Sequence, residues 1–239
     1  MKGLFGFFGS LVYTVLFFLS VLVFGFIVLL PDLIINERNR WRAVTAFAQT
    51  NIFMCRGLCG LDHEVVGLKN IPQEPCIVFL KHSSVYELFF ALTFFQPSSY
   101  VAKYELMFIP ILRGAIKALK CIPVKRGFGR REVARVVEKG EKRLNEGRWL
   151  VVCPEGTRVR HGETRKYGLS GALLAKGTDR PVVPVAHNAG YFWGRRSLFK
   201  KPGRITFSVG SKIATRGLDV LEINKRAQEW IEKEIKDLG

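Results

Sequence analysis

The stretch "CIVFLKHSSVYELFF", residues 76–90, contains the transition on which the fold prediction rests. Residues 76–80 are all apolar, which is typical of a strand buried on both faces. Residues 84–95 are apolar on nearly every side of a helical projection and are predicted to form a buried helix. His82 and Glu87 lie five residues apart, at the point where the strand gives way to the helix.

Two interpretations of Glu87 are open at this point. Ser84 and Glu87 have the S-x-x-E spacing of a helix capping box, in which the carboxylate would only satisfy backbone donors in the first turn. Alternatively, Glu87 orients His82, because an imidazole held by a carboxylate can act as a general base toward a hydroxyl group. The choice between a local and a catalytic role depends on the other polar residues of the chain.

Beyond residue 60 the chain alternates between short apolar runs and helical segments. We expect strands at 76–80, 100–102, 122–124, 149–153, 182–186 and 205–209, and helices at 84–95, 109–119, 131–145, 169–176 and 227–235. This order predicts an α/β fold in which a mixed sheet is covered by helices on both faces. Neither a G-x-x-x-x-G-K-[ST] loop nor a G-x-G-x-x-G loop occurs, so a nucleotide cofactor is not indicated.

The first 60 residues are predicted to form N-terminal hydrophobic membrane-anchoring helices, and residues 61–239 the α/β domain. No charged residue occurs from Gly3 to Pro31, a run of 29 residues where a membrane span needs roughly 20. Glycines within this run would equally allow a bent segment that lies in one leaflet. Three arginines follow the run within residues 38–42, and the positive-inside rule then places the α/β domain on the cytoplasmic side of the inner membrane.

Charge and cysteine content restrict the class of partner and the redox compartment. The formal net charge is +17, and residues 157–217 contain thirteen Lys or Arg against two acidic residues. Such a basic surface favours a polyanionic partner: nucleic acid, anionic membrane lipids or a phosphorylated substrate. The five cysteines are odd in number and lack C-x-x-C spacing, which favours reduced thiols over disulfides or a zinc site.

Polar residues that follow strands define the candidate site, because the carboxyl ends of parallel strands meet at one edge of a sheet. His82 and Glu87 follow one strand, Lys103 and Arg126 follow two others, and "PEGTR" at residues 154–158 follows a fourth. Together these residues supply a base, an orienting carboxylate and cations for a phosphate. Arginine is suited to bidentate phosphate contacts and lysine to point-charge contacts.

Four segments in this order resemble the sequence blocks of the glycerolipid acyltransferases, in particular the bacterial 1-acylglycerol-3-phosphate acyltransferase branch. They are "KHSSVYE", "KRG" after a strand, "CPEGTR" and "VVPVAHNAG", and the resemblance covers roughly residues 60–215. The family usually has His-x4-Asp in the first block, where this chain has the HX4E motif of His82 and Glu87. It often has Phe before P-E-G-T-R, where this chain has Cys153.

The resemblance implies that an acyl chain is transferred from acyl-CoA or acyl carrier protein to the sn-2 hydroxyl of lysophosphatidic acid, which yields phosphatidic acid. By resemblance, His82 takes the hydroxyl proton, Glu87 orients the imidazole, and no acyl-enzyme, cofactor or metal is needed. The glycerol phosphate is expected to be held by Lys103, Arg126 and Arg158, in a pocket shaped by Glu155, Gly156 and Thr157. Expected partners further include anionic membrane lipids, and nucleic acid is not expected.

Three alternatives are weighed against this interpretation. The acceptor could be glycerol-3-phosphate or another lysolipid. A thiol hydrolase that uses Cys153 or Cys121 is disfavoured, because both cysteines lie in apolar strand segments where a nucleophile would be poorly exposed. A non-enzymatic, basic protein that binds membrane surfaces or nucleic acid would account for the charge, but not for His82 together with P-E-G-T-R.

Overall fold

The computed structural model describes residues 2–125 and 129–239, so the predicted site residue Arg126 lies outside the described residues. Within these ranges the α-helices are α1 (Lys2–Leu29), α2 (Glu37–Cys59), α3 (Tyr86–Phe94), α4 (Pro110–Ala118), α5 (Gly129–Asn145), α6 (Ser170–Thr178), α7 (Ala189–Phe192) and α8 (Val220–Asp237). Two short 3-10 helices are η1 (Leu68–Asn70) and η2 (Tyr104–Phe108).

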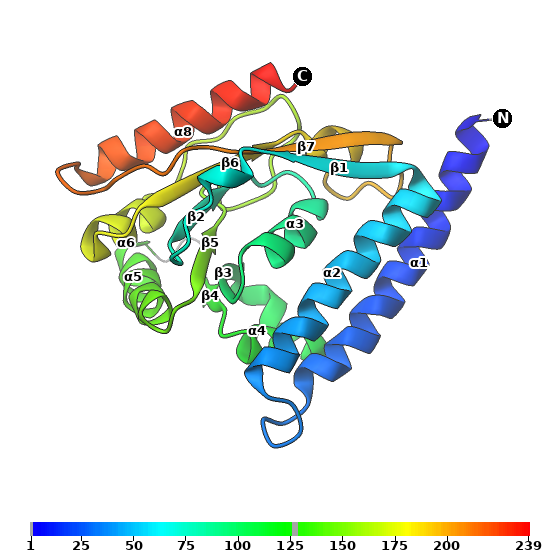
Figure 1. The fold of residues 1–239 in the computed structure, drawn as a ribbon, viewed down its shortest axis with the longest axis horizontal. Helices are drawn as coiled ribbons and strands as arrows, with labels where there is room; N and C mark the ends of the chain where they lie inside the picture. The colour runs from blue at the N-terminus through cyan, green and yellow to red at the C-terminus, as the bar shows by residue number, and fades with distance from the viewer. Residues whose placement is uncertain (1, 126–128) are drawn as a thin grey trace.

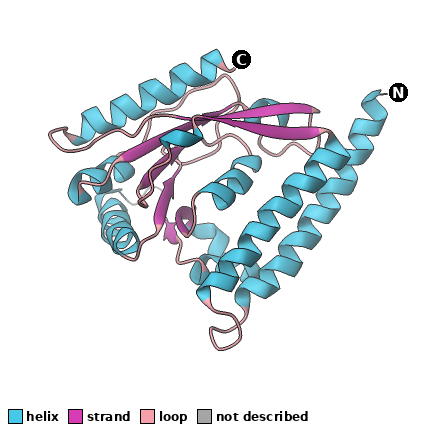
Figure 2. Cartoon of the chain, in the orientation of Figure 1, coloured by secondary structure: helices cyan, strands magenta, loops and turns pink. Residues whose placement is uncertain are grey.

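The strands are β1 (Leu61–Val66), β2 (Ile77–Leu80), β3 (Ser98–Lys103), β4 (Ile122–Val124), β5 (Trp149–Val152), β6 (Val182–His187) and β7 (Gly203–Val209). The strands, magenta in Figure 2, form one sheet, and their order in it is β1-β7-β6-β2-β5-β3-β4. The strands from β6 to β4 in this order run parallel, β7 is antiparallel to β6, and β1 is parallel to β7. The sheet is therefore mixed, as the sequence predicts.

Strand β2 lies inside the sheet and separates two apolar layers. Successive side chains of a strand point to opposite faces, so Ile77 and Phe79 pack into one core cluster while Val78 and Leu80 pack into the other. The first cluster includes residues of α5, α6 and α8, and the second includes residues of α2 and α3. Figure 1 shows these helices on the two sides of the sheet, which confirms the prediction of an α/β fold covered on both faces.

Strand β1 is the one strand of the described residues that the sequence pattern does not indicate. Only Leu61 at its beginning is fully buried, and the residues that follow include Asp62, His63 and Glu64. The strand lies at the edge of the sheet and pairs with β7 alone. An edge strand that is covered on one face needs no continuous apolar run, so its sequence resembles a loop.

Helices α1 and α2 lie side by side and pack against the rest of the chain (Figure 1). Their backbones approach closely at Gly9, where a Cβ atom would come within 1.9 Å of the carbonyl oxygen of Leu58. Tyr13 of α1 is fully buried in the same core cluster as Phe89 of α3. The apolar core therefore continues across residue 60, where the sequence predicts that the anchoring helices end and the α/β domain begins.

A buried lysine adds a polar connection between α1 and the loop that precedes β7. The Lys200 ammonium donates hydrogen bonds to the Ser10 carbonyl at 3.2 Å, to Thr14 Oγ1 at 2.5 Å and to the Leu198 carbonyl at 2.9 Å. It also lies 5.0 Å from the centre of the Tyr13 ring, within cation–π range. These contacts fix the position of α1 relative to β7.

The outer side of α1 remains apolar and exposed. Residues Gly6–Leu29 are long and apolar enough to cross a membrane, and only 17% of the most apolar window is buried against the protein. Exposed side chains there include Phe8, Val15, Phe18 and Phe26. An apolar surface of this extent is unfavourable in water, so the helix indicates membrane association.

Candidate active site

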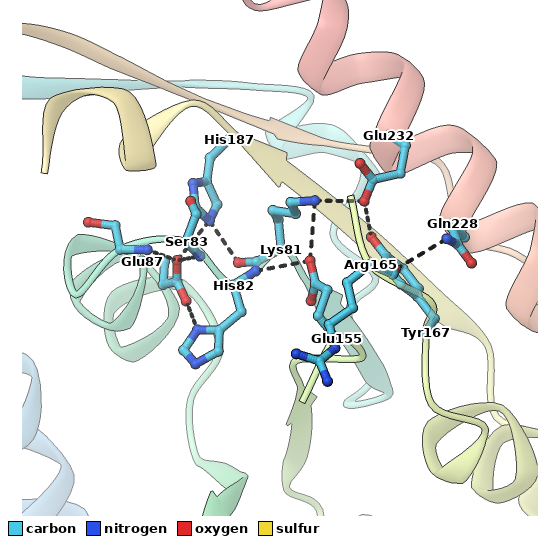
Figure 3. Close-up of polar contacts among 11 residues, drawn as sticks. Lys81, His82, Ser83, Glu87, Glu155, Arg165, Tyr167, His187, Gln228 and Glu232 are labelled. Carbon is cyan, nitrogen blue, oxygen red and sulfur yellow. Dashed lines mark hydrogen bonds and ion pairs between the residues drawn. The ribbon is translucent and has the colours of Figure 1, made fainter. Parts of the chain in front are cut away.

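The His82 and Glu87 side chains are in direct contact where β2 passes into α3 (Figure 3). His82 follows the end of β2, and Glu87 lies in the first turn of α3. The imidazole Nδ1 donates a hydrogen bond to Glu87 Oε1. The His82 side chain is 23% exposed and the Glu87 side chain only 4%, so the carboxylate lies beneath the ring. With Nδ1 committed to Glu87, Nε2 remains as the ring nitrogen that can accept a substrate proton.

The second carboxylate oxygen of Glu87 accepts hydrogen bonds from backbone N–H groups. Glu87 Oε2 accepts hydrogen bonds from the N–H groups of Ser83 at 2.9 Å and Ser84 at 2.8 Å. Both N–H groups belong to the turn between β2 and α3, which the carboxylate therefore stabilises. The Ser84 hydroxyl accepts the N–H of Tyr86 at 3.2 Å. One oxygen therefore satisfies the backbone while the other faces His82, and the two interpretations of Glu87 are not mutually exclusive.

A second histidine, His187 at the end of β6, contacts the same carboxylate from behind. Its Nδ1 accepts the N–H of Ala189 at 3.2 Å, so the ring carries its proton on Nε2. This Nε2 lies 2.8 Å from the Lys81 carbonyl oxygen and 3.1 Å from Glu87 Oε2. Since the side chain is fully buried, His187 is held with its single Nε2–H between the Lys81 carbonyl oxygen and Glu87 Oε2, and it has no access to substrate.

The electrostatic environment makes His82 a stronger base than a free histidine. Burial alone would lower the pKa of His82, but the acidic neighbours Cys153 and Glu87 outweigh burial and hold this pKa above its usual value. Burial would raise the pKa of Glu87, and the two histidines overcome it and keep the pKa of this carboxyl below its usual range. At neutral pH Glu87 is ionised, and its charge stabilises a proton on His82.

The P-E-G-T-R loop is held against His82 by backbone hydrogen bonds. Gly156 adopts a φ of +69°, a left-handed conformation that favours glycine, and its N–H bonds to the Cys153 carbonyl at 3.0 Å. Beyond the turn, the Val159 N–H donates to the His82 carbonyl oxygen at 2.7 Å. The loop after β5 therefore returns to the segment that carries the base.

Glu155 is a residue of this loop, and its side chain belongs to a buried ionic network (Figure 3). Its side chain is fully buried, 3.4 Å from the Lys81 ammonium and 3.4 Å from the His82 N–H. Lys81 also pairs with Glu232 of α8 at 2.7 Å, and Glu232 accepts the Tyr167 hydroxyl proton at 3.0 Å. Burial raises the pKa of Glu155, and the charge of Lys81 opposes this only in part. The network connects α8 to both loops, and a direct contact of Glu155 with substrate stays a prediction.

Of the predicted phosphate-binding residues, Arg158 and Lys103 are described, and both lie at the same edge of the sheet, after β5 and at the end of β3. Arg158 is partly buried, and its Nε is a buried donor with no hydrogen-bond partner among the described residues. Lys103 ends β3, two strands from β2, and pairs with Glu105 at 3.2 Å on the surface. Gly156 is exposed and Thr157 partly exposed at the tip of the loop. The structure thus brings His82, Glu87 and the P-E-G-T-R loop into contact, while Lys103 lies farther along the edge.

Three residues near His82 are not among the predicted site residues. His187 lies within the quoted "VVPVAHNAG" block, and its place at the end of an apolar strand is the sequence signal that could have identified it. The structure places this strand next to β2. Lys81 resembles a surface charge in sequence, and only the fold shows that it is buried. Cys153 Sγ lies within 4.8 Å of both a His82 ring nitrogen and a Glu87 oxygen. Burial raises the pKa of Cys153, and His82 lowers it less, which argues against a nucleophilic thiolate.

Comparison with known proteins agrees with the motifs. A protein-family model described as Acyltransferase matches residues 62–188. A 1-acyl-sn-glycerol-3-phosphate acyltransferase of Pseudomonas aeruginosa is 34% identical, over 95% of this chain and 91% of the relative. An enzyme of the same name from Borreliella burgdorferi is 28% identical, over 75% of this chain and 71% of the relative.

The fold has a counterpart among solved structures. The crystal structure of the 1-acyl-sn-glycerophosphate (LPA) acyltransferase PlsC from Thermotoga maritima superposes with a TM-score of 0.82. The match covers 100% of this chain and 98% of the other, at 21% sequence identity. It therefore shows that the two proteins have the same fold, including the arrangement of the N-terminal helices with the sheet.

Substitution of Glu87 by Gln separates its two roles. A Gln side chain keeps an acceptor for Ser83 and Ser84 but presents an uncharged amide to His82, which favours the wrong imidazole tautomer. We expect the melting temperature to change little and kcat to fall on the order of 10² or more. The lost charge also lowers the pKa of His82. Since the rate rises as this imidazole loses its proton, the acidic limb of the pH–rate profile should move to lower pH.

The exposed residue Glu138 on α5 provides a matched control, and Glu138→Gln should leave both quantities unchanged. Glu87→Asp keeps the charge and should be the milder change. A Glu87→Gln variant with wild-type kcat and an unmoved pH profile would show that Glu87 is only a helix cap.

Substitution of His187 tests whether the buried donor matters for turnover. His187→Phe removes the donor beneath Glu87, whereas His187→Gln can place an amide N–H near the same point. We expect the Phe variant to lose about tenfold in kcat, equivalent to about 1.5 kcal/mol for a hydrogen bond to a charged group. The Gln variant should recover most of this loss, and both are compared with wild type in kcat and in thermal stability. If the Phe and Gln variants lost the same amount of kcat although their thermal stabilities differed, a specific role of the donor would be refuted.

Proposed function

The chain belongs to the acyltransferase family, and we propose that it acylates the sn-2 hydroxyl of 1-acyl-sn-glycerol-3-phosphate, using an acyl thioester and producing phosphatidic acid. The observation that carries the proposal is the contact between His82 and Glu87, next to the P-E-G-T-R loop. This arrangement supplies a base for a hydroxyl and cations for a phosphate at one edge of the sheet. The relatives bear the name of this reaction.

The reaction proceeds by direct transfer. His82 Nε2 removes the proton of the acceptor hydroxyl while the oxygen attacks the thioester carbonyl. Glu87 keeps Nδ1 protonated and stabilises the imidazolium that forms. Collapse of the tetrahedral intermediate breaks the carbon–sulfur bond, and His82 returns the proton to the leaving thiol. No covalent acyl-enzyme is required, so the side chains need only bind, orient and move one proton.

Arg158 is the residue proposed to grip the acceptor phosphate. Its guanidinium lies on the loop that bonds to the His82 backbone, and its buried Nε has no hydrogen-bond partner among residues 2–125 and 129–239. A buried donor without a partner is costly, and a phosphate oxygen would satisfy it. Lys103 and Arg126 are proposed as further cations for the same phosphate, and Thr157 with Gly156 as the tip of the pocket.

The donor and the membrane are proposed on chemical grounds. Acyl-CoA and acyl carrier protein both present a phosphopantetheine thioester, and the site chemistry suits either. The acceptor is a lipid, and the apolar outer side of α1 would keep the enzyme at the inner membrane, where anionic lipids attract its basic residues. We place the α/β domain on the cytoplasmic side, because arginines follow α1.

Product formation from defined substrates tests the proposed activity. Full-length protein in detergent is incubated with a labelled acyl thioester and, separately, lysophosphatidate, glycerol-3-phosphate and other lysolipids. Lysophosphatidate should give labelled phosphatidic acid at the highest kcat/KM, and His82→Ala should abolish this product. Preference for glycerol-3-phosphate or another lysolipid would overturn the acceptor assignment. Absence of any product would support a basic binding protein instead.

Substitution of Arg158 by Lys tests the phosphate contact. An ammonium cannot reproduce the planar fork of the guanidinium, so the KM for lysophosphatidate should rise by about tenfold, while the KM for the thioester stays near wild type. Arg160, which is exposed two residues later, provides the control variant Arg160→Lys. Equal losses against both substrates would assign Arg158 to bracing the loop, and unchanged KM values would remove it from the site.

A further inference from the structure

Three side chains with metal-ligating atoms meet at the centre of the candidate active site. A His82 ring nitrogen, a Glu87 carboxylate oxygen and Cys153 Sγ all lie within 4.8 Å of one another. The sheet imposes this proximity, because β2 and β5 are adjacent and parallel with Phe79 opposite Val152. The residues that follow these strands must then emerge side by side.

The donor set has the chemistry of a zinc site. Zinc takes histidine nitrogen, cysteine sulfur and carboxylate oxygen in tetrahedral geometry, with bonds of about 2.0–2.3 Å, which places neighbouring ligands about 3.5 Å apart. The 4.8 Å limit exceeds this spacing by about 1 Å, whereas His82 Nδ1 and Glu87 Oε1 are already in hydrogen-bond contact, so side-chain rotations that close the wider pairs and open this one would bring the three atoms to bonding positions. A thiolate and an imidazole favour zinc or a softer ion over magnesium and calcium, which prefer sites composed of oxygen.

The site can be reached from solvent. The His82 side chain is 23% exposed, and Cys153 is partly exposed. Glu87, at 4% exposed, forms the floor. Three protein ligands leave the fourth position of a tetrahedral ion open to water, which is the coordination of an accessible site rather than of a closed structural one.

We propose that His82, Glu87 and Cys153 form an inhibitory binding site for a thiophilic divalent cation such as Zn²⁺. On binding, the thiol of Cys153 releases its proton to solvent and its sulfur bonds to the ion, with no change of oxidation state. Coordination through His82 Nε2 blocks the atom that must accept the substrate proton. Coordination through Nδ1 breaks the hydrogen bond to Glu87. Either mode removes the base, so the bound enzyme is inactive until the ion is chelated.

The inhibition rests on the proposed function, but the metal site itself does not, because binding can be measured without turnover. Cys153 supplies the one ligand of the three that the proposed reaction does not use. Cys153→Ala therefore removes a metal ligand while leaving the hydrogen bond between His82 and Glu87 in place, and its own activity without added metal is the reference for its inhibition. Cys121, the other partly exposed cysteine of the described residues, lies between α4 and β4 and provides the matched control Cys121→Ala.

The first experiment measures binding directly. Reduced, chelator-treated full-length protein in detergent is titrated with Cd²⁺, whose thiolate complexes absorb in the ultraviolet, and with Zn²⁺ by calorimetry. Wild type and Cys121→Ala should show one thiolate-dependent site that Cys153→Ala lacks. Identical titrations of wild type and Cys153→Ala would overturn the proposal, whether or not the protein proves to be an acyltransferase.

The second experiment measures inhibition at buffered free Zn²⁺. Wild type and Cys121→Ala should lose activity and regain it with a chelator, whereas Cys153→Ala should need about tenfold or more Zn²⁺ for the same loss. Inhibition of wild type and Cys153→Ala at equal Zn²⁺ would mean that the ion acts on the substrates or elsewhere on the protein, and would overturn the proposal.

Discussion

The buried carboxylate of Glu87 is the interaction on which the site depends. An ionised carboxylate removed from water costs several kcal/mol unless it is paired and hydrogen-bonded. Here four donors meet that cost: His82 Nδ1, the N–H groups of Ser83 and Ser84, and His187 Nε2. These donors come from the end of β2, the turn into α3 and the end of β6. The charge therefore holds three elements in place, and its hydrogen bond from His82 Nδ1 orients the base.

A second charged group holds the other side of His82. Lys81 reaches the opposite face of the sheet and pairs with Glu155 and Glu232, so it connects the P-E-G-T-R loop to α8. Lys81 and His82 are consecutive in sequence, yet each belongs to a different buried ionic network. The two networks share no side chain. Alternation of side chains at the end of β2 explains this division, since adjacent residues point to opposite faces. The base is positioned from both sides while its Nε2 stays accessible.

The sequence predicts the strands from β2 to β7, the helices α3 to α6 and α8, and the pair of His82 and Glu87, because buried strands and helical periodicity are local signals. It does not predict β1, whose polar residues lie at a sheet edge. It also does not predict the burial of Lys81 or the contact of His187 with Glu87, which depend on which strands become neighbours. The order of strands is set by long-range packing, and one chain's residue pattern does not specify it.

The central claim is that Glu87 fixes the proton of His82 on Nδ1 and leaves Nε2 to titrate. It is tested most directly by nitrogen-15 NMR of imidazole-labelled protein in detergent, with the His82 signals assigned by their loss in His82→Ala. The account predicts that Nδ1 stays protonated throughout a pH titration, that only Nε2 loses its proton, and that the pKa lies above that of free histidine. A His82 that deprotonates at Nδ1, or that titrates at or below the pKa of free histidine, would contradict it.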